Sequence, residues 1–150
     1  MLEPGTAAPS FTLTDHDGDS VTLPDTGVVV LYFYPRADTP GCTAQACGFR
    51  DNWEGFERRS VRVLGVSDDP VEELWAFQQK YELPISLLSD EDGAVARAYH
   101  SYGEKTHYGN TYEGVFRNTY LVDDGRIERR YEGVDPERHA ETLLADIDAR

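Results

Sequence analysis

The residues of this chain that could do chemistry are concentrated in one short stretch. Its two cysteines, Cys42 and Cys47, lie five positions apart, and Thr39 stands three residues before the first of them. The thiolate form of cysteine is a nucleophile, and a threonine hydroxyl can both donate and accept a hydrogen bond. In a reducing compartment, two thiols this close indicate catalysis or metal binding rather than a structural disulfide.

The segments around this stretch should place Cys42 at the start of a helix. Residues Val28–Tyr34 are mostly β-branched and aromatic, which is typical of a buried strand, and Pro35 and Pro40-Gly41 end it in a tight loop. Beyond the loop, steps of four and three residues predict one helical face with these members: Cys42, Ala46, Phe49, Trp53 and Phe56. The unpaired N–H groups of a helix N-terminus favour negative charge and lower the pKa of a thiol, so we expect Cys42 to be the nucleophile.

The spacing of the two cysteines decides whether they can pair. Five residues of helix rise about 7.5 Å and turn the side chains about 140° apart, which separates the two Cα atoms by roughly 8.5 Å. A disulfide requires Cα atoms within about 7 Å. The two thiols can therefore join only if the first turns of the helix unwind, and Gly41 and Gly48 lower the cost of that unwinding.

The same stretch resembles the active-site pattern P-x-x-x-T-x-x-C of the peroxiredoxins, with Pro35, Thr39 and Cys42 in register. The longer pattern T-P-G-C-T-x-x-x-C is similar to the Q-type subfamily, also called bacterioferritin comigratory proteins. Other blocks resemble that subfamily in the same order: Gly5–Leu13, Leu64–Ser67, Leu87–Asp90, Tyr102–Lys105 and Arg117–Asp123. The resemblance implies a thioredoxin-like fold and a thiol-dependent peroxidase that needs no cofactor.

The resemblance also implies a role for each matching residue. Cys42 would attack hydrogen peroxide or an organic hydroperoxide and become a sulfenic acid, and Cys47 would resolve it as an intramolecular disulfide. Residues implied to bind the peroxide or to shape its pocket are Pro35, Thr39, Pro40, Gly41, Cys42 and Arg117. Thioredoxin or a similar dithiol would reduce the disulfide, and Q-type members are commonly monomers. Two positions depart from the pattern: Gln45 stands where many relatives carry glutamate, and Tyr102 where tryptophan is common.

Arg117 has a second interpretation when its surroundings are considered alone. It interrupts an apolar segment, Val115–Asp123, that is expected to be a strand, where an unpaired guanidinium is costly to bury. Without the family pattern, a structural salt bridge is the favoured interpretation. With the family pattern, the arginine would stabilise the Cys42 thiolate and the oxygen that leaves the peroxide.

Length and charge narrow the class of protein. A chain of 150 residues is the size of one domain, so residues 1–150 are expected to form a single thioredoxin-like peroxiredoxin domain. The net charge of −14, from 28 acidic and 14 basic residues, argues against nucleic acid and anionic membranes as partners.

No signal-peptide pattern or membrane-length apolar run is present, which predicts a cytoplasmic protein. We favour adaptation to high salt as the reason for the acidity, over an ordinary acidic cytosolic protein.

The remaining segments complete an α/β order. Phe11–Thr14 and Val21–Leu23 predict a β-hairpin extension at an edge of a central mixed sheet flanked by helices. Further expected strands are Val61–Ser67, Ile85–Leu88, Val115–Asp123 and Arg126–Tyr131, and further helices begin at Asp69-Pro70, Ala94 and Asp135-Pro136. His100–Gly114 is expected to be a long loop. Strand, helix and strand, followed by a hairpin and a helix, is the order of a thioredoxin-like domain.

Other functions stay open on the residues alone. The histidines are scattered without metal-ligand spacing and are expected on the surface or in loops, so no metal is predicted: His16, His100, His107 and His139. A thiol oxidoreductase acting on protein disulfides would usually carry C-x-x-C, which this chain lacks. Fold alone does not distinguish a redox-inert binding or chaperone module.

Overall fold

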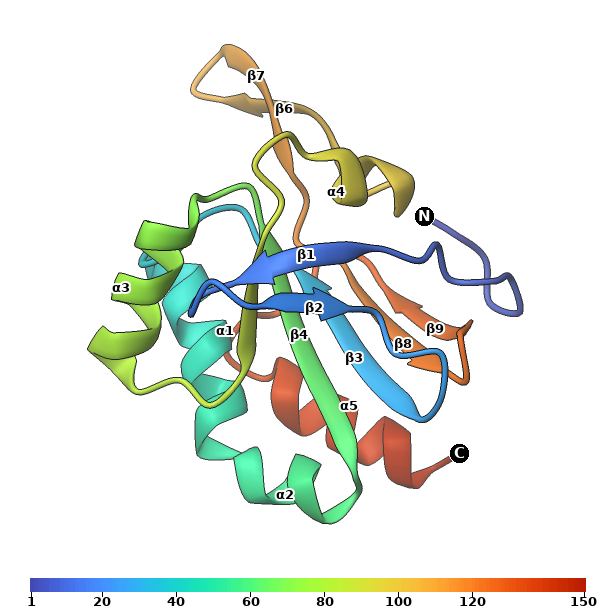
Figure 1. Cartoon of the computed structure of the whole chain (residues 1–150). Coiled ribbons are helices and arrows are strands. Elements are labelled where there is room, and N and C mark those ends of the chain that lie inside the picture. The colour runs from blue at the N-terminus through green and yellow to red at the C-terminus, as the bar shows by residue number, and fades with distance from the viewer.

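The computed structural model describes residues 1–150 as nine strands and five helices (Figure 1). The strands are β1 (Thr12–Asp15), β2 (Ser20–Thr22), β3 (Val28–Phe33), β4 (Val61–Ser67), β5 (Ser86–Ser89), β6 (Tyr102–His107), β7 (Asn110–Val115), β8 (Thr119–Asp123) and β9 (Arg126–Tyr131). The helices are α1 (Pro40–Asp51), α2 (Trp53–Arg58), α3 (Val71–Tyr81), α4 (Ala94–Ala98) and α5 (His139–Asp148). No helix combines the length and the apolar character needed to cross a membrane.

Seven strands form one mixed sheet in the order β2-β1-β5-β4-β3-β8-β9. Strand β4 pairs in parallel with β3 and β5, and the other neighbours pair antiparallel. The β1–β2 hairpin lies at one edge of the sheet, where β1 pairs with β5. These pairings confirm the predicted central mixed sheet, flanked by helices, with an N-terminal hairpin extension.

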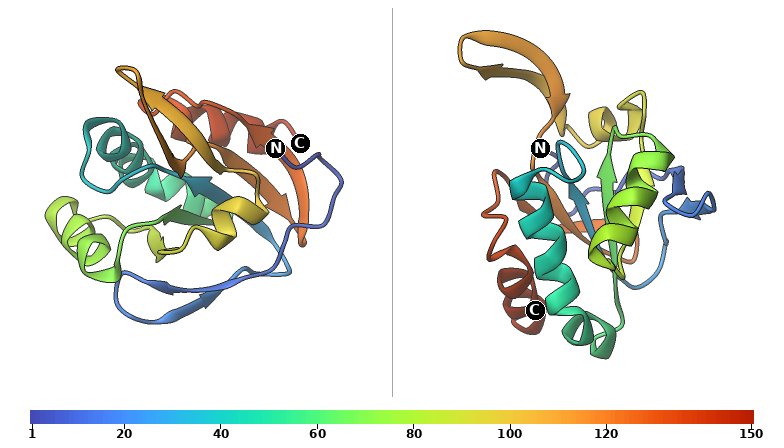
Figure 2. Two further views of the ribbon diagram at one scale, coloured as in Figure 1. Left: turned by 90° about the horizontal axis from the view of Figure 1, so that it is seen from above. Right: turned by 90° about the vertical axis from the view of Figure 1, so that its left-hand side faces the viewer.

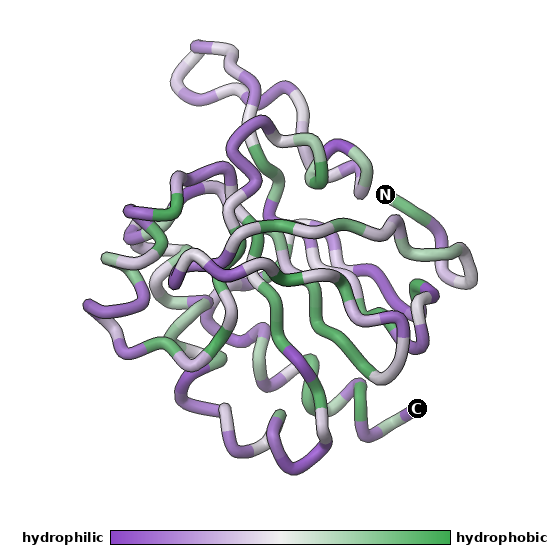
Figure 3. Tube along the Cα trace, in the orientation of Figure 1, coloured by the Kyte–Doolittle hydropathy of each residue, from purple (hydrophilic) through white to green (hydrophobic).

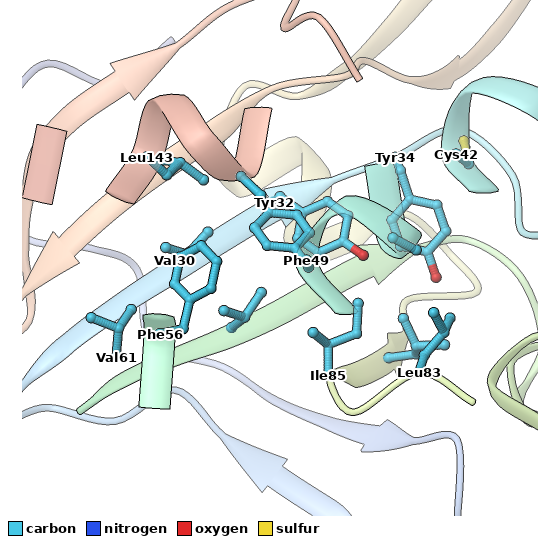
Figure 4. Close-up of a cluster of buried hydrophobic side chains, with 14 of the residues drawn as sticks. Val30, Tyr32, Tyr34, Cys42, Phe49, Phe56, Val61, Leu83, Ile85 and Leu143 are labelled. Atoms are coloured by element: carbon cyan, nitrogen blue, oxygen red, sulfur yellow. The ribbon is translucent and has the colours of Figure 1, made fainter. Parts of the chain in front are cut away.

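Strand β3 lies inside the sheet with both of its faces buried. Val30 and Tyr32 belong to the core cluster formed with α1, α2, α3 and α5, and Figure 4 shows Tyr32 beside Phe49. Leu31 and Phe33 belong to the opposite cluster, which α4 and the N-terminal segment cover. Figure 3 shows the same contrast along the chain, with apolar inner strands and a mainly polar β6–β7 hairpin. Packing on both faces fixes the end of β3. The loop of residues 34–39, called the cysteine loop because it leads to Cys42, begins at that end.

The predicted helical face is divided between two helices. Helix α1 ends at Asp51, and Asn52 separates it from α2 with a backbone φ of −108° and ψ of 14°. The Gly48 carbonyl accepts from the Asn52 side chain at 2.8 Å and from the Asn52 backbone N–H at 3.2 Å, so Asn52 caps this end of the first helix with both groups. Of the predicted face, Cys42, Ala46, Phe49 and Phe56 are buried, whereas Trp53 is only half-buried.

The prediction of a long loop at His100–Gly114 is wrong, because most of this segment forms the β6–β7 hairpin. These strands pair from Tyr102 with Val115 to His107 with Asn110, and the hairpin projects from the rest of the molecule (Figure 2). Tyr108 and Gly109 form the turn with φ angles of 51° and 79°, which suits a two-residue hairpin connection. The exposed hairpin has almost no apolar alternation, so the usual strand signal is missing.

Three predicted boundaries also need correction. Helix α5 begins at His139 rather than at Asp135-Pro136, because residues 136–138 form a turn. Helix α3 begins at Val71 with Pro70 at its N-cap, and the Asp69 side chain binds elsewhere. The expected strand Val115–Asp123 is interrupted, since β7 ends at Val115 and β8 begins at Thr119.

His139 is not a surface or loop histidine, contrary to expectation. It lies at the start of α5 with 3% of its surface exposed, and its Nε2 is 2.8 Å from Thr119 Oγ1. Its ring also packs edge-on against Phe49 and Tyr131. Burial lowers the pKa of His139 from 6.5 to about 4.

This burial predicts a pH-dependent loss of stability. Between pH 6.5 and pH 4 the unfolded chain binds a proton at His139 that the folded chain does not, so the free energy of unfolding falls as pH falls. The full effect is about 3 kcal/mol near pH 4. Urea unfolding across this range should show a shallower pH slope for His139→Gln than for the wild type. His107→Gln, at an exposed position, should keep the wild-type slope, and parallel curves for all three proteins would contradict the prediction.

Candidate active site

Cys42 lies where the sequence predicted, in the first turn of α1. Thr39 occupies the N-cap with extended backbone, and Pro40 is the first helical residue, a position that proline favours because its N–H is not needed there. Only 2% of the Cys42 surface is exposed, and the residue lies next to Tyr34 at one end of the core cluster (Figure 4). The sulfur is therefore shielded from bulk water and close to the unpaired N–H groups of the helix start.

Arg117 reaches this sulfur from the segment between β7 and β8. Its Nη2 donates to Cys42 Sγ at 3.3 Å, and its Nη1 donates to Gln45 Oε1 at 2.7 Å. None of the ion pairs in the structure includes Arg117, so its partners are the thiol and an amide rather than a carboxylate. A Cβ at Gly41 would lie 3.0 Å from Arg117 Nη2, so glycine at this position leaves space for the guanidinium.

Two carboxylates anchor the loop that precedes α1. Asp69 Oδ2 accepts from the backbone N–H of Ala37 at 2.7 Å and from the Ser67 hydroxyl at 2.8 Å. Asp38 has a φ of 58° and binds Lys80 Nζ at 2.8 Å and the Tyr81 hydroxyl at 2.6 Å. The loop is thus fixed to β4 and to the end of α3, and motif reasoning found neither anchor.

The Thr39 hydroxyl does not cap helix α1, although Thr39 is the N-cap residue. Its Oγ1 donates to the carbonyl of Arg36 at 2.8 Å, and it makes no side-chain cap bond. The proton of the hydroxyl is therefore engaged, and the oxygen lone pairs remain free to accept a hydrogen bond. A hydroperoxide O–H is a suitable donor to that oxygen.

Cys47 lies apart from this arrangement. Both cysteines are free, and α1 is continuous across both of them. Cys47 is half-buried near Arg50, and burial raises the pKa of its thiol while Arg50 lowers it. The structure therefore brings Cys42, Arg117, Gly41 and the helix start together, but it does not bring Cys47 to Cys42.

Comparison with known proteins identifies the family. Residues 4–130 match the model of the AhpC/TSA family. Peroxiredoxin Bcp of Escherichia coli strain K12 is 44% identical over 146 residues, which cover 95% of this chain and 94% of that protein. The chain belongs to the AhpC/TSA family of peroxiredoxins.

Solved structures place the chain with the Q-type or Bcp peroxiredoxins and confirm the thioredoxin-like fold. A mutant of PrxQ from Xylella fastidiosa aligns with a TM-score of 0.92 and 30% identity, covering 99% of this chain and 97% of that one. Peroxidoxin BcpB of Mycobacterium tuberculosis aligns with a TM-score of 0.88 and 32% identity, covering 99% and 98%. Membership of this family implies thiol peroxidase activity.

Position 45 carries glutamine in this peroxiredoxin, where the family pattern predicts glutamate. The side chain is 1% exposed, its Oε1 accepts from Arg117, and its Nε2 has no hydrogen-bond partner. Gln45 follows Cys42 by three residues, a spacing that places both side chains on one side of the helix. The amide therefore keeps the hydrogen bond that orients Arg117, although it carries no charge.

Removing this acceptor should misplace Arg117. We expect Gln45→Leu to lower kcat/KM for hydrogen peroxide by about tenfold, because a guanidinium held only by the thiol loses its orientation. Gln45→Glu keeps an oxygen in the same place and should restore most of that loss. Peroxide consumption by both variants, with melting curves as a check on folding, measures the effect. A glutamate variant as slow as the leucine variant would contradict a positioning role.

Tyr102 and Lys105, at the two ends of the block Tyr102–Lys105, have different neighbours in the structure. Tyr102 begins β6, and its ring packs against the guanidinium of Arg97, 4.2 Å from the ring centroid. Lys105 is half-buried and donates from Nζ to the carbonyl of Val115 at 2.9 Å. Burial and the neighbouring Arg117 lower the pKa of Lys105. Lys105 forms no ion pair with Glu104, although the two residues are neighbours in the sequence.

A cleft with a volume of about 650 Å³ opens beside Arg117. Its lining residues are Met1, Pro35, His100, Lys105, Phe116, Arg117, Asn118, Glu132 and Gly133. Pro35 and Arg117 are thus shared between the cysteine site and the cleft. The volume lies within the range of small-molecule sites in proteins.

Proposed function

We propose that this protein reduces hydrogen peroxide and organic hydroperoxides through Cys42 and Cys47, and that a thioredoxin-type dithiol regenerates it. The observation that carries the proposal is the contact from Arg117 Nη2 to Cys42 Sγ at 3.3 Å, in the first turn of a helix. The relatives support it, since one solved neighbour is described by the alkyl peroxide reduction activity of the Xanthomonas campestris bacterioferritin comigratory protein.

In the first step, the Cys42 thiolate attacks the terminal oxygen of the hydroperoxide. A sulfur–oxygen bond forms while the oxygen–oxygen bond breaks, and the departing alkoxide or hydroxide takes a proton to leave as alcohol or water. Thr39 accepts the hydrogen bond of the attacked hydroperoxide, and Arg117 stabilises the charge that develops on the two oxygens. Pro35, Pro40 and Gly41 form the surrounding loop and helix start. Cys42 becomes a sulfenic acid.

In the second step, Cys47 resolves the sulfenic acid. The Cys47 thiol attacks Cys42 Sγ, a disulfide forms, and the sulfenic oxygen leaves as water. The first turns of α1 must unwind for this step, because the intact helix holds the two Cα atoms roughly 8.5 Å apart. A dithiol donor then reduces the disulfide by exchange and is itself oxidised.

Intact mass spectrometry before and after one equivalent of hydrogen peroxide tests the proposal. We expect the loss of two hydrogen atoms, mapped by peptide analysis to a Cys42–Cys47 disulfide, and recovery of the original mass on addition of reduced thioredoxin. An unchanged mass would overturn the peroxidase assignment. A gain of oxygen on Cys42 without a disulfide would overturn the resolving role of Cys47.

A further inference from the structure

Tyr81, at the end of α3, binds both flanks of the segment that carries the two cysteines. Its hydroxyl donates to Asp38 Oδ1 at 2.6 Å, two residues before α1 begins. Its backbone carbonyl accepts from Arg50 Nη1 at 2.8 Å, near the C-terminal end of the same helix. Both cysteines lie between these two points of attachment. One residue of α3 therefore holds the start and the end of the segment that must change shape before the cysteines can pair.

The contacts of Asp38 bridge a hollow. Lys80 Nζ binds Asp38 Oδ2 at 2.8 Å, beside the bond from Tyr81, and we call Asp38, Lys80 and Tyr81 the clasp. The bonds from Lys80 and then Tyr81 lower the pKa of Asp38, so its carboxylate is charged at neutral pH. Behind the clasp, a hollow of about 270 Å³ separates the cysteine loop from α3. Its lining residues are Ala37, Asp38, Glu73, Ala76, Phe77 and Lys80. Because this space is not filled by apolar side chains, the attachment of the loop to α3 depends on the polar clasp.

The backbone at Asp38 connects the clasp to the first turn of α1. Asp38 has a φ of 58°, in the left-handed region that residues other than glycine adopt at an energetic cost. This turn directs the chain into Thr39 and Pro40, the N-cap and the first residue of the helix. The carbonyl of Thr39 then accepts from the backbone N–H of Thr43 at 2.8 Å. Bonds that hold the Asp38 turn in place therefore also support the start of α1.

We propose that the clasp restrains the unwinding of α1 and thereby sets the rate at which Cys47 resolves the Cys42 sulfenic acid. This inference rests on the proposed peroxidase function and assigns a positioning role to three residues whose hydrogen bonds involve neither thiol. While the helix stays wound, the sulfenic acid can meet a second hydroperoxide. That reaction breaks another oxygen–oxygen bond, adds a second oxygen to the sulfur and releases water or alcohol, which leaves Cys42 as a sulfinic acid. The clasp thus sets the balance between disulfide formation and overoxidation.

Tyr81→Phe tests the clasp with the smallest change. It removes the hydroxyl but keeps the ring that packs against Phe77 and the carbonyl that binds Arg50. Quenched-flow alkylation and mass spectrometry, after one equivalent of hydrogen peroxide, give the rate of disulfide formation. Tyr81→Phe should form the disulfide about fivefold faster than the wild type, and Lys80→Met about twofold faster, because an exposed ion pair contributes less. Tyr108→Phe removes a hydroxyl from an exposed position on the β6–β7 hairpin and should keep the wild-type rate.

Two further readouts distinguish a local clasp from a general loss of stability. Amide hydrogen exchange of residues 42–47 should be about fivefold faster in Tyr81→Phe, whereas the amides of β3 and β4 should exchange as in the wild type. With a dithiol donor present, the peroxide concentration that converts half of Cys42 to sulfinic acid should rise about fivefold.

Three results would overturn the inference. The first is disulfide formation in Tyr81→Phe that is no faster than in the wild type. The second is faster exchange spread evenly over the α1 amides and those of β3 and β4, which would show that the variant loosens the whole domain. The third is the absence of any disulfide in the peroxide-treated wild type, which would overturn the proposed function and this inference with it.

Discussion

Replacing Cys42 by serine is expected to lower kcat/KM for hydrogen peroxide by more than about a thousandfold, because a serine hydroxyl is not ionised near neutral pH and cannot take up the peroxide oxygen. Replacing Cys47 by serine should have a different effect. That variant keeps Cys42 and its contact with Arg117, so it should consume one equivalent of peroxide per chain and then stop. Peroxide consumption with and without thioredoxin distinguishes these two behaviours.

The two cysteine variants control for each other. Both remove one thiol and add one hydroxyl, and they differ in whether the residue lies beside Arg117 or beside Arg50. Melting curves show whether the serine at the buried position of Cys42 is tolerated. Sustained thioredoxin-dependent turnover by Cys47→Ser would contradict its resolving role, and unimpaired turnover by Cys42→Ser would contradict the whole mechanism.

Loss of the Arg117 guanidinium should produce the second largest effect. Arg117→Met should slow the first oxidation of Cys42 by about a hundredfold to a thousandfold, because the donor that faces both the sulfur and the developing oxygen charge is lost. Arg117→Lys keeps a charge, but a single ammonium cannot bind Cys42 and Gln45 together with the same geometry, so it should restore only part of the rate. Stopped-flow measurement of the first oxidation gives the rate constants.

Arg62→Met is the matched control for this experiment. Arg62 is exposed on β4 and makes no side-chain hydrogen bond or ion pair in the structure, so its removal changes the net charge without touching the site. We expect the rate of this variant to stay within about twofold of the wild type, since isolated surface charges act weakly at ordinary ionic strength. Equal losses in the Arg62 and Arg117 variants would show that net charge, and not the contact with Cys42, controls the rate.

The sequence was sufficient to predict those elements that a local pattern of residue types specifies. The runs Val28–Phe33 and Val61–Ser67 are apolar because both faces of these central strands are buried, so their composition alone indicates strands. The position of Cys42 at a helix start follows from the prolines and the glycine around it. The family pattern added the expected set of site residues, and the fold it implied is confirmed by the solved relatives.

The tertiary structure decided what depends on distant parts of the chain. The partners of Arg117 are 72 and 75 residues away in sequence, and the anchor of the cysteine loop at Asp69 is 32 residues from Ala37. The burial of His139 and the exposed β6–β7 hairpin likewise follow from how elements pack, and no local pattern records that packing. The physical reason is that residue type and spacing determine local backbone preference, whereas pairing, burial and the field around a charge are set only when the sheet brings remote segments together.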